Sequence, residues 1–465
     1  MSFTKKYFGD KAFYKVVLTV AVPIMIQNGI TNFVGLLDNI MVGQIGTEQM
    51  SGIAIVNQLL LVFNLAIFGA ISGVGIFGAQ FFGCGNHKGV QQTFRFKLYV
   101  CAGIVLLGIL LLIAGGEQMI LLYLHGDDNV QALQTTLAYG KQYLWVMLIG
   151  LAPFAVEEIY ASTLRECGET KIPMVAGAVA VGVNLVLNYV LIFGKLGFPV
   201  LGVVGAAVAT VISRFVQAAV VIVWTHTHSE KMPFILGAYR EFKVPGQLAW
   251  NIVKKGTPLL FNEILWAAGI ALLNQCYSLR GLDAVAAQNI SSTIANLFNV
   301  VFMAMGSSIA IIVGQLLGAG KMEEAKDTDR KLIVFSVLSC LVFGSLMFAF
   351  APLFPRHYNT SDQVKELAVW LLRISAGCMP LHAFVHAAYF TMRSGGKTVI
   401  TFLFDSAYLW CVNIPLAYVL SRFTTMPMTL LYFCCQAIDL TKCIIGFILV
   451  KRGVWLNNIV AESTS

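Results

Sequence analysis

Charged side chains are scarce in this chain of 465 residues: Asp, Glu, Lys and Arg make up only 12% of it, while hydrophobic residues make up 58%. Soluble globular proteins carry about 25% charged residues, so the composition argues against a soluble enzyme and indicates a polytopic membrane protein. With roughly 20 apolar residues needed per span, we expect an all-α fold of about twelve transmembrane helices. They are predicted near residues 14–41, 50–80, 92–115, 130–164, 171–193, 202–225, 247–278, 284–316, 331–354, 362–391, 398–420 and 427–450.

Catalytic and phosphate-binding motifs are missing as well. The sequence contains no GxxxxGK[ST], HExxH or GxSxG pattern, and no soluble segment is long enough to form an ATPase domain. The ten cysteines lie mostly inside predicted spans and never at metal-ligand spacing, so we assign them to packing. We therefore expect no enzyme and no cofactor, and an ion gradient as the energy source.

The basic surplus, a net charge of +8, is arranged as a topology signal. If the N-terminus is cytoplasmic, most Lys and Arg fall on the cytoplasmic side, and few, such as Lys195, Arg280, Arg356 and Arg422, fall on the other. This pattern favours a protein of the cell (inner or plasma) membrane with both termini cytoplasmic. It gives no reason to expect a nucleic-acid partner.

The second half of the chain repeats the first. PIMIQNGITNFVGLLDNIMVGQIG (23–46) aligns without a gap with PLLFNEILWAAGIALLNQCYSLRG (258–281), and at the same offset Gln80 matches Gln315 and Gly83 matches Gly318. Later, LRECGETK in the first half corresponds to MRSGGKT in the second. We expect an N-lobe (1–228), a cytoplasmic linker (229–246) and a C-lobe (247–465).

Each lobe would hold six spans. An even number of spans per repeat means that both lobes face the same way, so a pseudo-two-fold axis along the membrane normal should relate them. In transporters built in this way, the substrate site lies between the repeats.

The order of these motifs resembles a known transporter family. DNIMVGQIG after the first-span proline, LRECGETK, NLVLNYVLIFGKLGFPVLGVVGAAVAT, RSGGKT and DSAYLWCVNIP are similar to the multidrug and toxic compound extrusion (MATE) transporters over about residues 15–450. The resemblance implies two six-helix bundles in a V and a secondary active antiporter. Such a carrier exports amphipathic organic cations in exchange for H⁺ or Na⁺ by alternating access.

The partners expected on this basis are small-molecule substrates and the lipid bilayer, with the chain acting as a monomer. An alternative is a lipid-linked-precursor flippase of the same superfamily. A flippase that handles anionic pyrophosphate carriers would need several cationic groups in its cleft. In this sequence Arg373 is the only strong candidate, which counts against the flippase.

Asp38 is the first candidate functional residue, because an acid inside an apolar span is costly. It matches the first-helix aspartate of the family, so we expect it to couple transport to H⁺ or Na⁺; a helix-end role, near Gly43 and Gly46, is the alternative. Asn184 and Asn188 lie on one helical face, and Thr210 lies in the next span. With Asp38 the asparagines form a possible Na⁺ site, the alternative being polar packing between helices.

The second half carries its acids elsewhere. We expect Glu263, Arg373, Asp405, Trp266 and His386 to contribute to substrate binding or gating, with Arg373 paired to Glu263 or Asp405, because an unpaired buried charge is expensive. Such a pair could be structural or could be broken by substrate or by a proton, and His386 with His382 could be hydrogen-bonded core.

Glu157 and Glu158 end the fourth predicted span. We expect one of them to pair with a nearby base and the other to be solvated.

Overall fold

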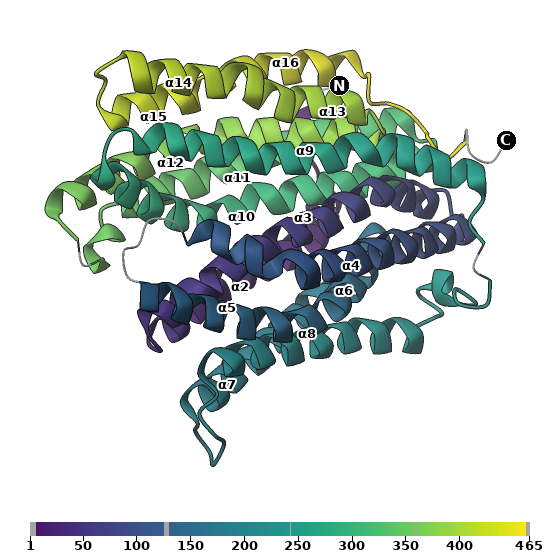
Figure 1. Cartoon of the computed structure of the whole chain (residues 1–465). Coiled ribbons are helices and arrows are strands. Elements are labelled where there is room, and N and C mark those ends of the chain that lie inside the picture. The colour runs from purple at the N-terminus through teal and green to yellow at the C-terminus, as the bar shows by residue number, and fades with distance from the viewer. Residues whose placement is uncertain (1–5, 125–129, 242, 359, 462–465) are drawn as a thin grey trace. The chain divides into compact units, whose positions relative to one another are not determined.

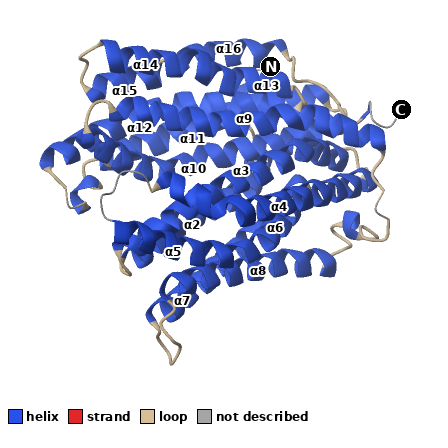
Figure 2. Cartoon of the chain, viewed as in Figure 1, coloured by secondary structure: helices blue, strands red, loops and turns tan. Residues whose placement is uncertain are grey.

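The computed structural model describes residues 6–124, 130–241, 243–358 and 360–461, apart from the side chains of residues 34, 36–40 and 130. In this part of the chain every regular element is helical and there is no strand (Figure 2). The order along the chain is α2 (Lys11–Gly43), α3 (Thr47–Gly83), α4 (His87–Tyr123), α5 (Val130–Ile149), α6 (Leu151–Glu166), α7 (Lys171–Phe193), α8 (Gly202–Thr227), η1 (Pro233–Ile235), α9 (Gly246–Ser278), α10 (Leu282–Gly318), α11 (Met322–Phe350), η2 (Pro355–His357), α12 (Asp362–Ser394), α13 (Thr398–Phe402), η3 (Leu403–Ala407), η4 (Leu409–Asn413), α14 (Ile414–Phe423), α15 (Met428–Ala437) and α16 (Asp439–Arg452) (Figure 1).

The membrane-spanning prediction is confirmed. In the described residues, eleven helices are long and apolar enough to cross a bilayer, and the number rises to twelve when α5 and α6 are taken as one bent span. Their ends agree with the predicted spans to within a few residues for most helices, because each apolar run is closed by a polar turn.

The fourth span differs from the expected continuous helix over 130–164, since α5 and α6 meet at 45°. Pro153, in the first turn of α6, has no N–H to donate to the carbonyl of Ile149. At the same place Nη1 of Arg214 donates a hydrogen bond to the carbonyl of Gly150, at 3.1 Å. A missing backbone donor and a side chain from α8 together account for the bend.

The chain divides into two compact units. We call residues 26–78 and 87–249 the N-terminal unit, and residues 1–25, 79–86 and 250–465 the C-terminal unit. The C-terminal unit has a core of aliphatic and aromatic side chains from α10, α11 and α12, including Leu371, Ile309 and Met392. The N-terminal unit also buries a charge pair, Lys97 Nζ with Glu166 Oε1 at 2.6 Å.

The turn glycines of the internal repeat adopt matching conformations. Gly85 and Gly320 follow α3 and α10 with φ angles of +74° and +73°, a region that favours glycine. The duplication seen in the sequence is therefore a duplication of backbone geometry at the end of each second span.

Within the C-terminal unit, the last turn of α3 crosses the last turn of α10 at backbone contact. A Cβ added to Gly83 would lie 1.9 Å from the carbonyl oxygen of Gln315, and one added to Gly318 would lie 1.9 Å from that of Gln80. Only glycine allows this approach, and the two contacts are equivalent in the repeat, since Gly83 matches Gly318 and Gln80 matches Gln315.

The C-terminal segment 453–461 closes over this crossing. Gln80 is fully buried; its Nε2 donates to the carbonyls of Ser394 (2.9 Å) and Asn457 (3.2 Å), and its Oε1 accepts from the Ile459 N–H (2.9 Å). Asn458 Nδ2 donates to the Gly318 carbonyl at 3.0 Å. One buried amide thus joins α3, the end of α12 and the tail of the chain.

Candidate functional site

The predicted coupling residues lie in the N-terminal unit. Asp38 is on α2, and its side chain lies outside what the structure describes. Asn184 and Asn188 on α7 are 5% and 2% exposed, and Asn188 Nδ2 donates to Asn184 Oδ1 at 3.0 Å. Asn184 Nδ2 lies 3.4 Å from Thr210 Oγ1 on α8. The structure thus brings together the three neutral residues of the predicted site.

Close packing of α7 on α8 makes this cluster possible. A Cβ at Gly205 would lie 2.6 Å from the carbonyl oxygen of Leu191, so a larger residue would push the two helices apart. Thr210 donates its own proton to the Ala206 carbonyl at 3.0 Å, which leaves the hydroxyl oxygen as an acceptor. Amide and hydroxyl oxygens of this kind are ligands for hard cations, and they also hydrogen-bond to a carboxyl group.

The second cluster, in the C-terminal unit, is centred on Asp405. Its Oδ1 accepts from Lys442 Nζ on α16 at 2.8 Å, and its Oδ2 accepts from Asn262 Nδ2 on α9 at 3.1 Å. Asn262 is 1% exposed and also lies 3.3 Å from the Tyr389 hydroxyl on α12. Asp405 occupies η3, a π-helical turn of the kind often found at functional positions.

The predicted pairing of Arg373 is wrong. The partner of Asp405 is Lys442, and the Arg373 guanidinium instead lies over the rings of Phe348 (5.2 Å) and Trp370 (5.4 Å). Aromatic faces attract a cation electrostatically, so this half-buried arginine does not require a carboxylate. Arg373 and Lys442 are similarly distant from Asp405 along the chain, so the sequence alone does not show which of the two bases reaches the carboxylate.

The remaining predicted residues divide into two groups. Glu263 and His386 belong to the Asp405 cluster: both lie in its electrostatic field and in that of Arg393, and the His386 ring contacts Phe302 and Phe390 at 5.3 and 4.9 Å. Trp266, one turn after Glu263 on α9, is 44% exposed. Trp266 therefore lies at the surface of its unit, one helical turn along α9 from Glu263.

Tyr389 and Asn262 are members of this cluster that sequence reasoning missed. Asn262 immediately precedes Glu263, and its amide holds two elements together: besides binding Asp405, its Oδ1 accepts from the Ser406 N–H at 3.2 Å. A signal for Asn262 was present, since it is a polar residue in the apolar run of α9.

The expectation for the acid pair on α6 is half correct. Glu158 lies 3.9 Å from Arg165 and is the paired acid. The other acid, Glu157, is not solvated but 2% exposed. The physical reason is its position against α8, whose Gln217 and Arg214 lie near its carboxyl group.

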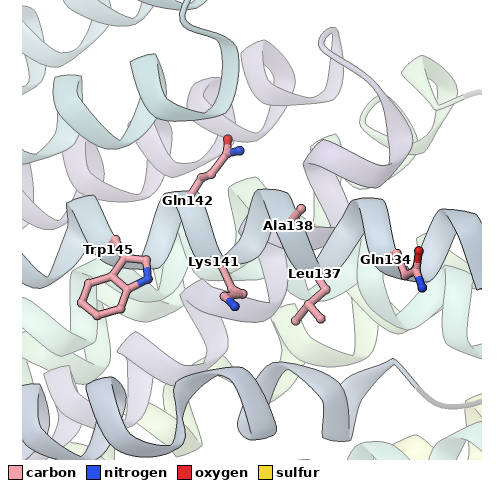
Figure 3. Close-up of a pocket in the computed structure, with 6 residues that line it drawn as sticks. All are labelled: Gln134, Leu137, Ala138, Lys141, Gln142 and Trp145. Carbon is pink, nitrogen blue, oxygen red and sulfur yellow. The ribbon is translucent and has the colours of Figure 1, made fainter.

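A surface hollow of about 480 Å³ lies along one face of α5. Gln134, Leu137, Ala138, Lys141, Gln142 and Trp145 line it, and Figure 3 shows that all six come from this helix. Lys141 is held by Glu117 on α4 at 2.7 Å. The face combines amide, cationic and aromatic side chains.

Comparisons with known proteins agree with the fold and the motif order. A family model described as MatE matches residues 23–190 and 258–419, more than half of the chain. A "Probable multidrug resistance protein NorM" of Thermotoga maritima is 25% identical over 419 residues, covering 88% of this chain and 86% of that protein. The "Probable multidrug resistance protein YoeA" of Bacillus subtilis is also 25% identical, with 88% and 87% covered.

Solved structures show the same fold. A structure described as "Crystal structure of MATE in the straight conformation" superposes with a TM-score of 0.84 at 18% identity, covering 98% of this chain and 99% of that one. An "Outward-facing conformation of a multidrug resistance MATE family transporter of the MOP superfamily" gives 0.83 at 18% identity, with the same coverage. The chain therefore belongs to the MatE family, the multidrug and toxic compound extrusion transporters, and it is a multi-pass membrane transporter rather than an enzyme.

Proposed function

We propose that this transporter is a secondary active antiporter that exports amphipathic organic cations in exchange for H⁺ or Na⁺ by alternating access. It would act as a monomer in the cell membrane, with both termini in the cytoplasm and with the lobes 1–228 and 247–465 joined by the linker 229–246. The relatives described as multidrug resistance proteins support export of organic compounds.

The observation that carries the proposal is the buried oxygen cluster of α7 and α8. Asn184, Asn188 and Thr210 are joined by contacts of 3.0 and 3.4 Å in an apolar environment. Such a cluster supplies neutral oxygens but no charge, so a cation site there needs an acid from another element. Asp38 on α2 is the acid that we assign to this role, with Asn184 and Asn188 as the other Na⁺ ligands when Na⁺ is the coupling ion.

We assign substrate contacts to the cluster of the C-terminal unit. Lys442 compensates the charge of Asp405 at 2.8 Å, and in the described residues Glu263 forms no ion pair within 4 Å. Glu263 is therefore the acid available to an organic cation, and the exposed indole of Trp266 offers an aromatic face beside it. His386 and Asp405 would orient this site through Asn262 and Tyr389.

The flippase alternative has less support from the geometry. A pyrophosphate group would need accessible cations, but Arg373 lies over two aromatic rings and Lys442 is committed to Asp405. Both of these cations are thus already stabilised by other groups.

The deciding experiment is transport of ethidium in proteoliposomes under imposed H⁺ or Na⁺ gradients. Asp38→Asn should lower gradient-driven efflux by at least about tenfold. A tenfold loss corresponds to a free energy inside the range of about 1–3 kcal/mol that is typical of coupling between sites. Asp283→Asn, which removes one exposed carboxylate at the start of α10, is the matched control and should behave as wild type. Equal gradient-driven efflux by wild type and Asp38→Asn would contradict the coupling assignment.

A further inference from the structure

We propose that the Glu157 carboxyl is a second proton-carrying group of the N-terminal unit, which binds a proton in one state of the transport cycle and releases it to water in the other. This inference rests on the proposed ion-coupled function. It assigns a role to an acid on α6, away from both clusters described above.

The first argument is burial without a complete set of partners. Glu157 is 2% exposed, and its Oε1 has no hydrogen-bond partner in the described structure. An ionised carboxylate with an unpartnered oxygen is costly in an apolar environment, whereas the neutral carboxyl is far less so. A bound proton is thus the natural occupant of this oxygen in the conformation seen here.

The second argument is that the charged form also has a place. Arg214 on α8 and Arg165 on α6 lie within the electrostatic field of Glu157, and the Gln217 amide is positioned to bond to its carboxyl group. When the O–H bond breaks and the proton passes to water, the carboxylate left behind can be stabilised by the Arg214 guanidinium. Both protonation states are therefore supported by groups already in position.

The charged groups near this site on α6 and α4 have partners of their own. Glu158 on α6 is a like charge whose own partner is Arg165, at 3.9 Å. On α4, Lys97 is bound to Glu166, and the Arg95 Nε donates to the Ala238 carbonyl at 2.7 Å.

On α5, Lys141 is bound to Glu117, while Tyr143 lies in the field of Arg214. Gln27, on α2, lies 3.4 Å from Arg165. Arg214 is thus the cation on α8 that can respond to the charge of Glu157.

Arg214 links the proton to the shape of the fourth span. It donates to the Gly150 carbonyl at the 45° bend and lies over the Phe154 ring at 5.0 Å. Ionisation of Glu157 would draw the guanidinium toward the carboxylate and away from Gly150. Protonation would return it to the bend.

The same arginine lies one helical turn along α8 from Thr210 of the predicted cation site. Thr210, Arg214 and Gln217 recur at helical spacing on α8, so they share one side of the helix. A positive charge that moves one turn from Thr210 changes the field at the oxygen cluster of α7 and α8. Proton release at Glu157 and cation binding near Thr210 are thereby coupled.

The test measures protons released when saturating ethidium is added to the detergent-purified, full-length protein in weak buffer between pH 5 and 9. Wild type and Glu158→Gln, the matched neighbouring acid, should release protons equally. Glu157→Gln should release fewer protons, because those from this site are lost. Its transport rate should also depend less on pH over the range in which the wild-type site releases its proton. A profile and proton count equal to those of wild type would overturn the inference, as would a wild type that releases no protons.

Two further variants separate this inference from the proposed function. Asp38→Asn should still release the protons that come from Glu157. If this variant leaves both the total proton release and the coupling unchanged, the proposed coupling site at Asp38 is wrong, while the proton-carrying role of Glu157 is unaffected. Arg214→Gln serves where Glu157→Gln does not fold: without the guanidinium, release should move to higher pH by about one unit or more. Release at an unchanged pH in Arg214→Gln would overturn the role of Glu157.

Discussion

Lys442 and Arg373 show at the residue scale how buried cations are stabilised in this transporter. Lys442 is 7% exposed and has both a carboxylate at 2.8 Å and the rings of Phe404 and Tyr408 at 5.3 and 5.7 Å. Arg373 has rings alone. The sequence predicted that the buried acid would have a basic partner. It did not show which one, because partner choice depends on which helix faces η3.

At the same scale we predict that Glu263→Gln weakens binding of organic cations more than it changes ion dependence. Loss of the one uncommitted acid of the Asp405 cluster should raise the Kd for ethidium about tenfold, equivalent to about 1.4 kcal/mol. Fluorescence titration of the purified protein measures this change directly.

Glu366→Gln, at the exposed start of α12, is the control in the same half of the chain. Binding curves for several cations that coincide with those of wild type would count against a substrate role for Glu263.

At the scale of elements, apolar run length was enough to predict the spans, since α7, for example, begins and ends at the predicted residues 171 and 193. Two local departures were not predictable in this way. At the bend, Arg214 reaches Gly150 from α8, and in the π-helical turns η3 and η4 the side chains of Asp405 and Asn413 bond to residues of other helices. In each case the partner is distant along the chain, so the length of an apolar run does not reveal it.

The crossing of α3 and α10 gives the element-scale prediction. Gly→Ala inside a helix ordinarily stabilises by about 0.5–1 kcal/mol. At Gly83 the added methyl group would meet the Gln315 carbonyl, and overpacking of this kind costs about 1–3 kcal/mol.

Thermal unfolding in detergent should therefore show a lower melting temperature for Gly83→Ala. Gly103→Ala on α4, where a Cβ meets nothing within 4 Å, should give the same or a higher melting temperature than wild type. If both variants shift in the same direction, the close crossing is not present in the folded protein.

At the scale of the whole molecule, the charge pattern predicts which side of the membrane each loop occupies. Cys84, exposed in the turn between α3 and α4, should be cytoplasmic together with both termini. A membrane-impermeant maleimide should label it in inside-out vesicles and leave it unlabelled in intact cells, and Cys84→Ser defines the background. Labelling in intact cells would reverse the predicted topology.

Cys167 provides an internal reference for this experiment. It lies just beyond α6, and burial raises the pKa of its thiol, so the reactive thiolate is scarce at pH 7 and scarcer still as the pH falls. We expect it to react only after unfolding, at any pH near neutral.

The hydrogen bonds of Gln80 have a consequence for how the protein is made. Its partners Asn457 and Ile459 are 377 and 379 residues further along the chain, so this amide is synthesised early and cannot complete its hydrogen bonds until residues 457–459 have left the ribosome. Contacts of such long sequence separation form late. The C-terminal segment therefore closes over the α3–α10 crossing only after residues 457–459 have been made, and a nascent protein that stops before residue 457 leaves the Oε1 of Gln80 without the Ile459 N–H.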